Sequence, residues 1–173
     1  MSPEQQKQRA ASLRAVVAFI HDALPDIDKL VRSSEDASRR LSENSSDSLL
    51  VFGAGGLLHG FYNELEKLFE IIATEIDGFE PRGEDWHARL SSQMFLGIPT
   101  LRPPIFPKEM LARLREFRSF RHLYRHLYVL DLDPNKVLPL LKALPKFWEE
   151  ANCHFAALVS RLIAIADALE ELG

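Results

Sequence analysis

An all-α bundle of up-and-down helices is the fold class that the sequence predicts. Apolar residues recur at three- and four-residue spacing along the chain, and no segment shows sustained alternation of apolar and polar residues. The length of 173 residues suits one domain with a substantial core. We therefore expect a single helical domain over residues 1–173, with an N-terminal helical extension (1–46) and a bundle (47–173).

The first half of the chain predicts two long helices. Apolar residues at helical spacing run from Leu13 to about Leu41, and Pro25 is expected to kink or interrupt this helix. Residues 42–48 form a polar loop rich in N-cap residues, and the second helix is expected over 49–76.

Three glycines near the start of the second helix predict close packing. The stretch 51–60 lacks the Gly-Lys-Ser/Thr of a phosphate-binding loop, and no predicted strand precedes it. Gly53, Gly56 and Gly60 instead stand at i, i+3 and i+7. This spacing would let another helix approach closely, either within the fold or across a dimer.

Proline and glycine mark the boundaries of the remaining elements. A loop at 78–83 precedes a short helix at 85–96, and four prolines make residues 97–107 an extended connector. A helix is then expected over 107–130, because Asp133 before Pro134 disfavours its continuation. A short helix at 134–143 and a last long helix starting at Pro145 complete the bundle.

Composition points to an intracellular protein that contacts no membrane. The only cysteine, Cys153, excludes an internal disulfide and is expected to pack in the core. The polar N-terminus does not resemble a signal peptide, and no apolar run approaches the ~20 residues of a membrane span. We expect a cytoplasmic location, no metal and no cofactor.

One basic segment stands out in a chain of net charge −4. Lys108 to His126 contain six Lys or Arg and two Glu, whereas the acidic excess lies elsewhere in the chain. A basic stripe on an acidic protein is typical of a binding site for nucleic acid.

The helix expected at 107–130 would be cationic on one face and apolar on the other. At ~100° per residue the cationic side chains fall within an arc of roughly 140°, and the remaining face is suited to a core. The cationic set is Arg115, Arg118, Arg121, His122, Arg125 and His126; the apolar set is Phe117, Phe120, Leu123, Tyr124, Leu127, Tyr128 and Leu130.

Arg121 and His126 are the candidate catalytic pair. RNA cleavage without a metal needs a group that moves protons near neutral pH and a fixed cation beside the phosphate, which suit His and Arg. The two positions lie about 140° apart on a helix, so a helix distortion, the reach of arginine or a second copy must bring them together. Spacing and charge alone favour a solvated basic face with His126 as a surface residue, and the spacing recurs by chance at Arg82 and His87.

The other polar residues of the segment have supporting roles. We expect Arg118, His122 and Arg125 to contact phosphate or bases. His122 and His126 have the i, i+4 spacing of metal ligands, but the neighbouring arginines would repel a cation.

The stretch from Arg121 to Tyr128 resembles the R-x4-H-x-Y motif of HepT-type toxins of the HEPN superfamily. The similarity extends to residues 55–67, 84–87, 102–104 and the flanks of the motif. It implies a HEPN-like homodimer whose motif helices line a shared cleft, metal-independent endoribonuclease activity, and Arg121 and His126 as catalytic residues. It also implies an MntA-type nucleotidyltransferase antitoxin that attaches AMP to Tyr128.

Two functions are consistent with these features, and a third interpretation is a plain helical scaffold with neither RNA affinity nor a partner. The first is a toxin that cleaves RNA, possibly tRNA, and is neutralised by the antitoxin. The second is a catalytically inactive helical module that binds a nucleotidyltransferase partner or a nucleotide. Substitution of Arg121 or His126 by alanine would abolish toxicity only in the first case.

Overall fold

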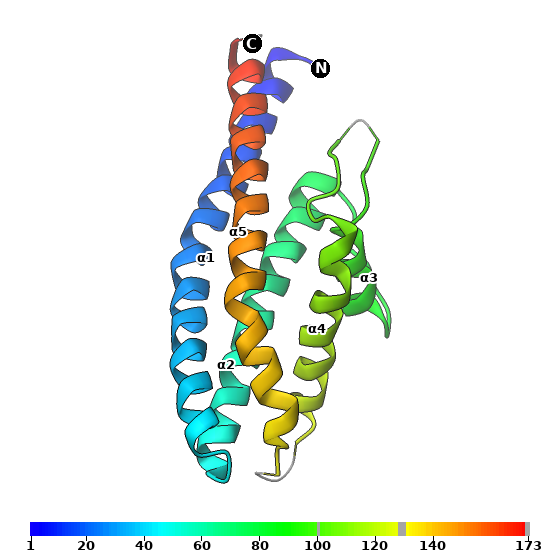
Figure 1. The fold of residues 1–173 in the computed structure, drawn as a ribbon. Helices are drawn as coiled ribbons and strands as arrows, with labels where there is room; N and C mark the ends of the chain where they lie inside the picture. Colours follow the sequence, from blue (N-terminus) through cyan, green and yellow to red (C-terminus); the bar gives the residue numbers. More distant parts are fainter. Residues whose placement is uncertain (100, 128–130, 172–173) are drawn as a thin grey trace. The chain divides into compact units, whose positions relative to one another are not determined.

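The computed structural model describes residues 1–99, 101–127 and 131–171, and within these the protein is all-α (Figure 1). The described residues form five α-helices and no strand beyond one isolated bridge between Ile98 and Arg102. The helices are α1 (Pro3–Glu43), α2 (Ser48–Ile71), α3 (Trp86–Gln93), α4 (Leu111–Arg125) and α5 (Pro134–Glu171). A π-helix at Ile72–Asp77 continues α2, and a 3₁₀ turn at Lys108–Met110 precedes α4. The predicted helical bundle is confirmed.

Prolines do not divide the helices where the sequence predicted. Pro25 lies inside α1, and both Pro139 and Pro145 lie inside α5, so the separate helix expected at 134–143 is wrong. An internal proline removes one backbone hydrogen bond and disfavours the helix locally. Here apolar side chains on either side of each proline are buried, including Ile20 and Ile27 in α1 and Leu141 in α5. We infer that this burial outweighs the local cost.

The chain forms two compact units, each built from separated segments. The first comprises Met1–Leu24, Glu66–Pro107 and Ala151–Gly173; the second comprises Pro25–Leu65 and Lys108–Glu150. The second unit contains α4 and the part of α2 that precedes Glu66. That the chain is one domain stays a prediction.

Phe61 of α2 is at the centre of the second unit's core. Its ring lies 5.6 Å from that of Phe117 on α4, and 6.2 and 6.0 Å from those of Phe147 and Trp148 on α5. Trp148 also donates its indole N–H to Oδ1 of Asp28 on α1 at 2.6 Å. These contacts hold one face of α4 against α2 and α5 and leave its other face to solvent.

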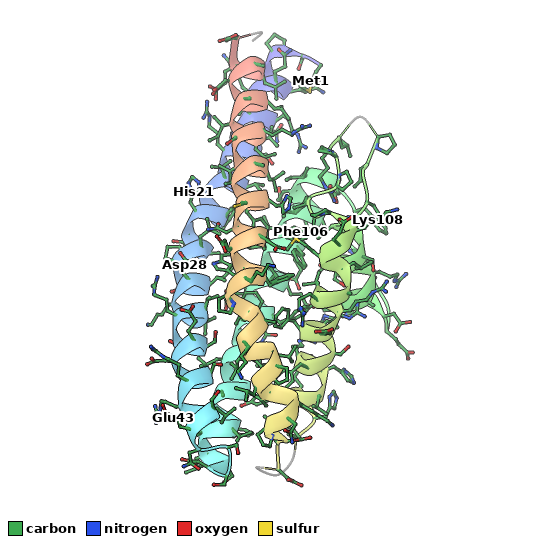
Figure 2. The ribbon with its side chains drawn as sticks, in the orientation of Figure 1. Met1, His21, Asp28, Glu43, Phe106 and Lys108 are labelled. Atoms are coloured by element: carbon green, nitrogen blue, oxygen red, sulfur yellow. The ribbon has the colours of Figure 1, made fainter. Side chains whose placement is uncertain are left out.

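Phe106 has the corresponding place in the first unit (Figure 2). Its ring lies within 5.8 Å of the rings of three other phenylalanines, on α2, after α3 and on α5: Phe69, Phe95 and Phe155. Cys153 is exposed on α5, so the expectation that it packs in the core is wrong.

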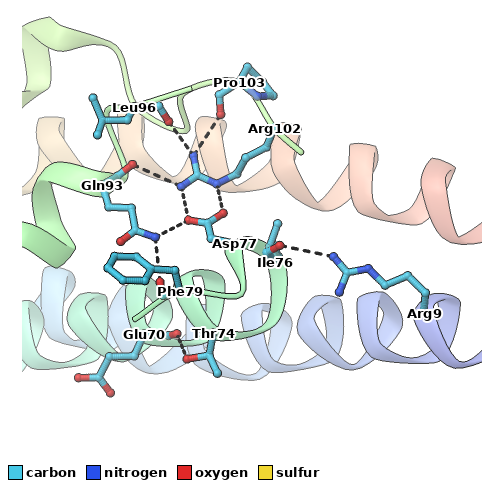
Figure 3. A network of polar contacts seen from close by, with 10 residues as sticks. All are labelled: Arg9, Glu70, Thr74, Ile76, Asp77, Phe79, Gln93, Leu96, Arg102 and Pro103. Atoms are coloured by element: carbon cyan, nitrogen blue, oxygen red, sulfur yellow. Dashed lines mark hydrogen bonds and ion pairs between the residues drawn. The ribbon is translucent and has the colours of Figure 1, made fainter. Parts of the chain in front are cut away.

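A buried ion pair holds the loop that follows α3 (Figure 3). Arg102 donates to both carboxylate oxygens of Asp77 at 2.6 Å. Its remaining N–H groups face the backbone carbonyls of Gln93, Leu96 and Pro103 at 3.0–3.3 Å. All five guanidinium donors therefore have an acceptor, which identifies Arg102 as a structural residue.

Of the helices in the described part of the chain, α5 is long and apolar enough to span a membrane by length and composition. The sequence expectation concerned uninterrupted apolar runs, and charged residues interrupt α5. Core helices of water-soluble proteins meet the same criterion, so the finding by itself assigns no membrane role.

Candidate nucleic-acid interface

Helix α4 ends earlier than the sequence predicted. It runs from Leu111 to Arg125, and His126 is the residue that caps it, with φ −106° and ψ 10°. The backbone N–H of His126 lies 3.1 Å from the carbonyl oxygen of Leu123, and that of Leu127 lies 3.3 Å from the carbonyl of Tyr124. These i to i+3 contacts tighten the last turn and place His126 at the helix end.

Arg121 is buried, which corrects its assignment to the exposed basic arc. Only 7% of the residue is exposed. On a helical projection it falls between Leu114 and Phe117, and both of these side chains are buried. Its Nε–H donates to Oδ1 of Asn63 on α2 at 3.1 Å, which provides an acceptor for the guanidinium inside the unit.

Asn63 is itself held by His59, one turn earlier on α2. Nδ2 of Asn63 lies 2.9 Å from Nε2 of His59. The Asn63 amide thus contacts Arg121 through its oxygen and His59 through its nitrogen. A continuous polar chain extends from α2 to the motif arginine of α4.

The environment of His59 favours its neutral form. Burial, followed by the positive charges of Arg121 and Arg125, lowers the pKa of His59 below its usual 6.5.

His126 lies on the exposed side of α4 and contacts His122. The two rings have centroids 4.5 Å apart, and Nδ1 of His126 lies 2.7 Å from the carbonyl oxygen of His122. A carbonyl oxygen only accepts, so Nδ1 must carry the hydrogen. In the neutral ring Nε2 is then the unprotonated nitrogen, which can accept a proton.

The remaining cationic residues of the expected arc lie mainly toward solvent. Arg115, His122 and Arg125 are exposed, and Arg118 is half-buried. The exposed face of α4 therefore presents cationic and imidazole groups next to His126, while the motif arginine lies on the inner face. Leu123, expected in the core, is 36% exposed.

Tyr124 and the glycines of α2 explain how closely α4 packs. The Tyr124 hydroxyl donates to the carbonyl of Phe52 at 3.2 Å, and burial raises the pKa of Tyr124 above 10.0. A Cβ atom on Gly55 would lie 2.8 Å from the Tyr124 ring, and one on Gly56 would lie 3.2 Å from its hydroxyl. The prediction of close packing is thus confirmed for Gly56.

Two other glycines differ from the expectation. A Cβ atom on Gly53 would meet nothing within 4 Å, and one on Gly60 would make ordinary contacts of at least 3.5 Å with Leu30. Gly55, which was not in the predicted spacing, is the most tightly packed of the four.

Two further expectations concern the modification of Tyr128 and the binding of a metal. Tyr128 lies outside the described residues. Within the described part of the chain, no three His, Cys, Asp or Glu side chains gather as metal ligands would.

The sequence reasoning missed His59 and Asn63 as partners of the motif. A signal was available, because these polar side chains stand four residues apart in the mostly apolar stretch 49–63 of α2. Their spacing placed them on one face of α2, but nothing in it indicated that the face meets Arg121.

Comparison with known protein families assigns the part of the chain that contains this site to one family. A family model described as HepT-like protein matches residues 53–162, which is more than half of the chain and includes all of α4. No curated protein and no solved structure matches the chain.

Proposed function

The chain belongs to the HepT-like family of HEPN-domain proteins, and on this premise we propose that it is a metal-independent endoribonuclease, the toxin of a toxin–antitoxin pair. The observation that carries the proposal is the arrangement at α4 within the matched region. Arg121 is held by side-chain hydrogen bonding, and five residues later His126 lies exposed with Nδ1 engaged. A fixed cation and an accessible imidazole are the groups that the reaction requires.

In the proposed reaction a ribose 2′-oxygen bonds to phosphorus as the bond from phosphorus to the 5′-oxygen breaks. One proton leaves the 2′-hydroxyl and one is delivered to the departing 5′-oxygen, so the products are a 2′,3′-cyclic phosphate and a 5′-hydroxyl. Nε2 of His126 is suited to move a proton, because Nδ1 already donates to His122. Arg121 would stabilise the negative charge that develops on the phosphate oxygens.

A homodimer would compensate for the separation of Arg121 and His126 within one chain. Arg121 faces the inner side of α4 whereas His126 is exposed, which agrees with the separation of about 140° expected on a helix. A second copy across a two-fold axis would supply a second set of both groups. Arg118, His122 and Arg125 would then bind the ribose-phosphate chain beside the shared cleft.

The proposed antitoxin is an MntA-type nucleotidyltransferase that transfers AMP to the hydroxyl of Tyr128. Tyr128 follows His126 by two residues, so an attached AMP would place a phosphate near the cationic face of α4. A covalently held anion there would compete with RNA for the same charges.

Cleavage of total RNA by the purified chain in excess EDTA tests the nuclease proposal. We expect cleavage by the wild type and a loss of at least about 100-fold in His126→Ala and Arg121→Ala. Arg82→Ala and His21→Ala are matched controls, since both residues are exposed and lie outside α4. Because Arg121 is buried, thermal melting must show that its variant is folded; Arg121→Lys provides a second variant that retains the charge.

Two results would contradict the proposal. The first is RNA cleavage that survives in folded His126→Ala and Arg121→Ala. The second is a wild type that cleaves no RNA but binds the nucleotidyltransferase, which would favour the inactive binding module. Incubation with the antitoxin and ATP tests the modification: the mass of one AMP should be added to the wild type and not to Tyr128→Phe.

A further inference from the structure

A polar chain from α2 reaches the motif arginine. His59, Asn63 and Arg121 are joined in series, with Nε2 of His59 2.9 Å from Nδ2 of Asn63 and Oδ1 of Asn63 3.1 Å from Nε of Arg121. All three residues belong to the same compact unit. This polar chain of side chains therefore connects α2 and α4 through two residues, Asn63 and Arg121, that are 58 positions apart in the sequence.

The direction of each hydrogen bond follows from the arginine. Its Nε–H only donates, so the Asn63 oxygen accepts and the Asn63 nitrogen faces His59. An amide nitrogen also only donates, so Nε2 of His59 must accept. The hydrogen of the neutral imidazole then resides on Nδ1, which is buried and has no hydrogen-bond partner within the described structure.

The groups around His59 favour this neutral state. On its own helix it faces Asn63, and from α4 it faces the Tyr124 ring at 5.2 Å together with the charges of Arg121 and Arg125. A protonated His59 would point an Nε2–H at the Asn63 amide nitrogen and add a third positive charge. The polar chain is thus consistent only with a neutral His59.

We propose that Asn63 and His59 are positioning residues that orient the guanidinium of Arg121 for the reaction. Asn63 fixes the guanidinium plane through Nε, and His59 fixes the Asn63 amide so that its oxygen faces the arginine. The consequence for catalysis rests on the proposed nuclease function, whereas the positioning itself does not. One readout is therefore chosen to be independent of RNA cleavage.

The independent readout is the side-chain Nε–H resonance of Arg121 in ¹H–¹⁵N spectra of ¹⁵N-labelled protein. We expect a resolved, slowly exchanging signal in the wild type, because the hydrogen is bonded and the side chain buried. Asn63→Leu removes the acceptor and should shift or broaden that signal. Asn152→Leu is the matched control: Asn152 is also half-buried, lies in the other unit and should leave the signal unchanged.

A second measurement needs no variant. Long-range ¹H–¹⁵N spectra of the imidazoles should show that His59 is neutral at pH ~7 with its hydrogen on Nδ1. An Nε2–H tautomer would reverse the donor and acceptor order and overturn the proposal, even if Asn63→Leu failed to fold.

The kinetic test asks whether kcat changes without KM. Asn63→Leu should lower kcat by up to about 100-fold, because a misplaced catalytic cation weakens the transition state, and KM should stay within about twofold. Asn63→Asp keeps an oxygen that accepts from Arg121 but places a second acceptor opposite Nε2 of His59, so it should recover only part of the activity. At the other position, His59→Gln keeps an acceptor and should resemble the wild type more than His59→Leu does.

The outcomes separate this inference from the proposed function. An unchanged Arg121 signal and unchanged kcat in folded Asn63→Leu would overturn the positioning role while leaving the nuclease intact. If the wild type cleaves no RNA but the Arg121 signal depends on Asn63, the positioning role is supported and the nuclease proposal fails.

Discussion

Asp77 and Arg102 form an ion pair that is almost completely removed from solvent, with side chains 0% and 1% exposed. The pair links the end of the π-helix to the proline-containing segment after α3. Gln93 adds a hydrogen bond from Nε2 to the same carboxylate at 2.7 Å. A buried charge pair of this kind makes each partner strongly dependent on the other.

Removing the carboxylate should be far more damaging than removing an exposed one. We expect Asp77→Ala to lower the free energy of unfolding by about 3–5 kcal/mol, because the buried Arg102 would lose two acceptors. Glu116→Ala breaks an exposed pair with Arg113 and should cost less than about 1 kcal/mol. Urea denaturation of both variants measures the difference; similar midpoints would contradict the burial of the pair.

Two glycines of α2 should respond oppositely to the same substitution. Gly55→Ala puts a Cβ 2.6 Å from Cδ2 of Leu132 and 2.8 Å from the Tyr124 ring, and we expect a destabilisation of about 1–3 kcal/mol. Gly53→Ala meets no atom within 4 Å and should stabilise the helix by up to about 1 kcal/mol. Thermal melting of the two variants tests the sign, and a stabilised Gly55→Ala would show that α4 does not approach α2 as described.

The lowered pKa of His59 predicts that the folded protein loses stability on mild acidification. The folded-state pKa of His59 lies below 6.5. Below about pH 6.5 the His59 imidazole therefore binds a proton more readily in the unfolded chain than in the folded chain. The stabilising contribution is therefore present above pH ~6.5 and is lost as pH falls through the folded-state pKa. The pKa of Glu170 is lowered from 4.5 by its hydrogen bond to Arg14, so that group acts at lower pH than this window.

The comparison of the wild type with His59→Gln isolates this contribution. The variant should lose less stability than the wild type between about pH 7.5 and pH 5, as measured by urea denaturation at each pH. Parallel losses in the two proteins would show that His59 does not titrate differently on folding.

The rate of RNA cleavage should depend on pH between ~5 and 8 if histidine carries the proton. One His126 acting as base and another as acid across a homodimer would give a bell-shaped profile of kcat/KM. Single-turnover cleavage of a short RNA across this range is the measurement. A flat profile would argue against His126 as the proton carrier.

The helical fold was predictable because it depends on local periodicity. The apolar spacing around Phe61 and Phe117 marks faces that become buried, whatever their partners are. The continuity of α5 was not predictable, because the cost of Pro139 and Pro145 is local whereas the offsetting burial comes from distant residues.

The candidate site was predictable in its composition but not in its environment. The exposed His126 and Arg125 follow from the helical projection of α4. Arg121 lies at the edge of the two faces, and the hydrogen bond from its side chain to Asn63, 58 residues away in sequence, accompanies its burial. A pattern read within one helix contains no information about such a partner.

Because each unit is built from separated segments of the chain, its core cannot be completed early in synthesis. Each unit draws on residues of α5, which follows the other described helices along the chain. Neither core can be completed before α5 begins to be made, because Phe61 lacks Phe147 and Phe106 lacks Phe155 until then. Both cores therefore stay incomplete until their residues of α5 have been synthesised, and an RNA-cutting activity of the kind proposed would arise only after that helix has joined them.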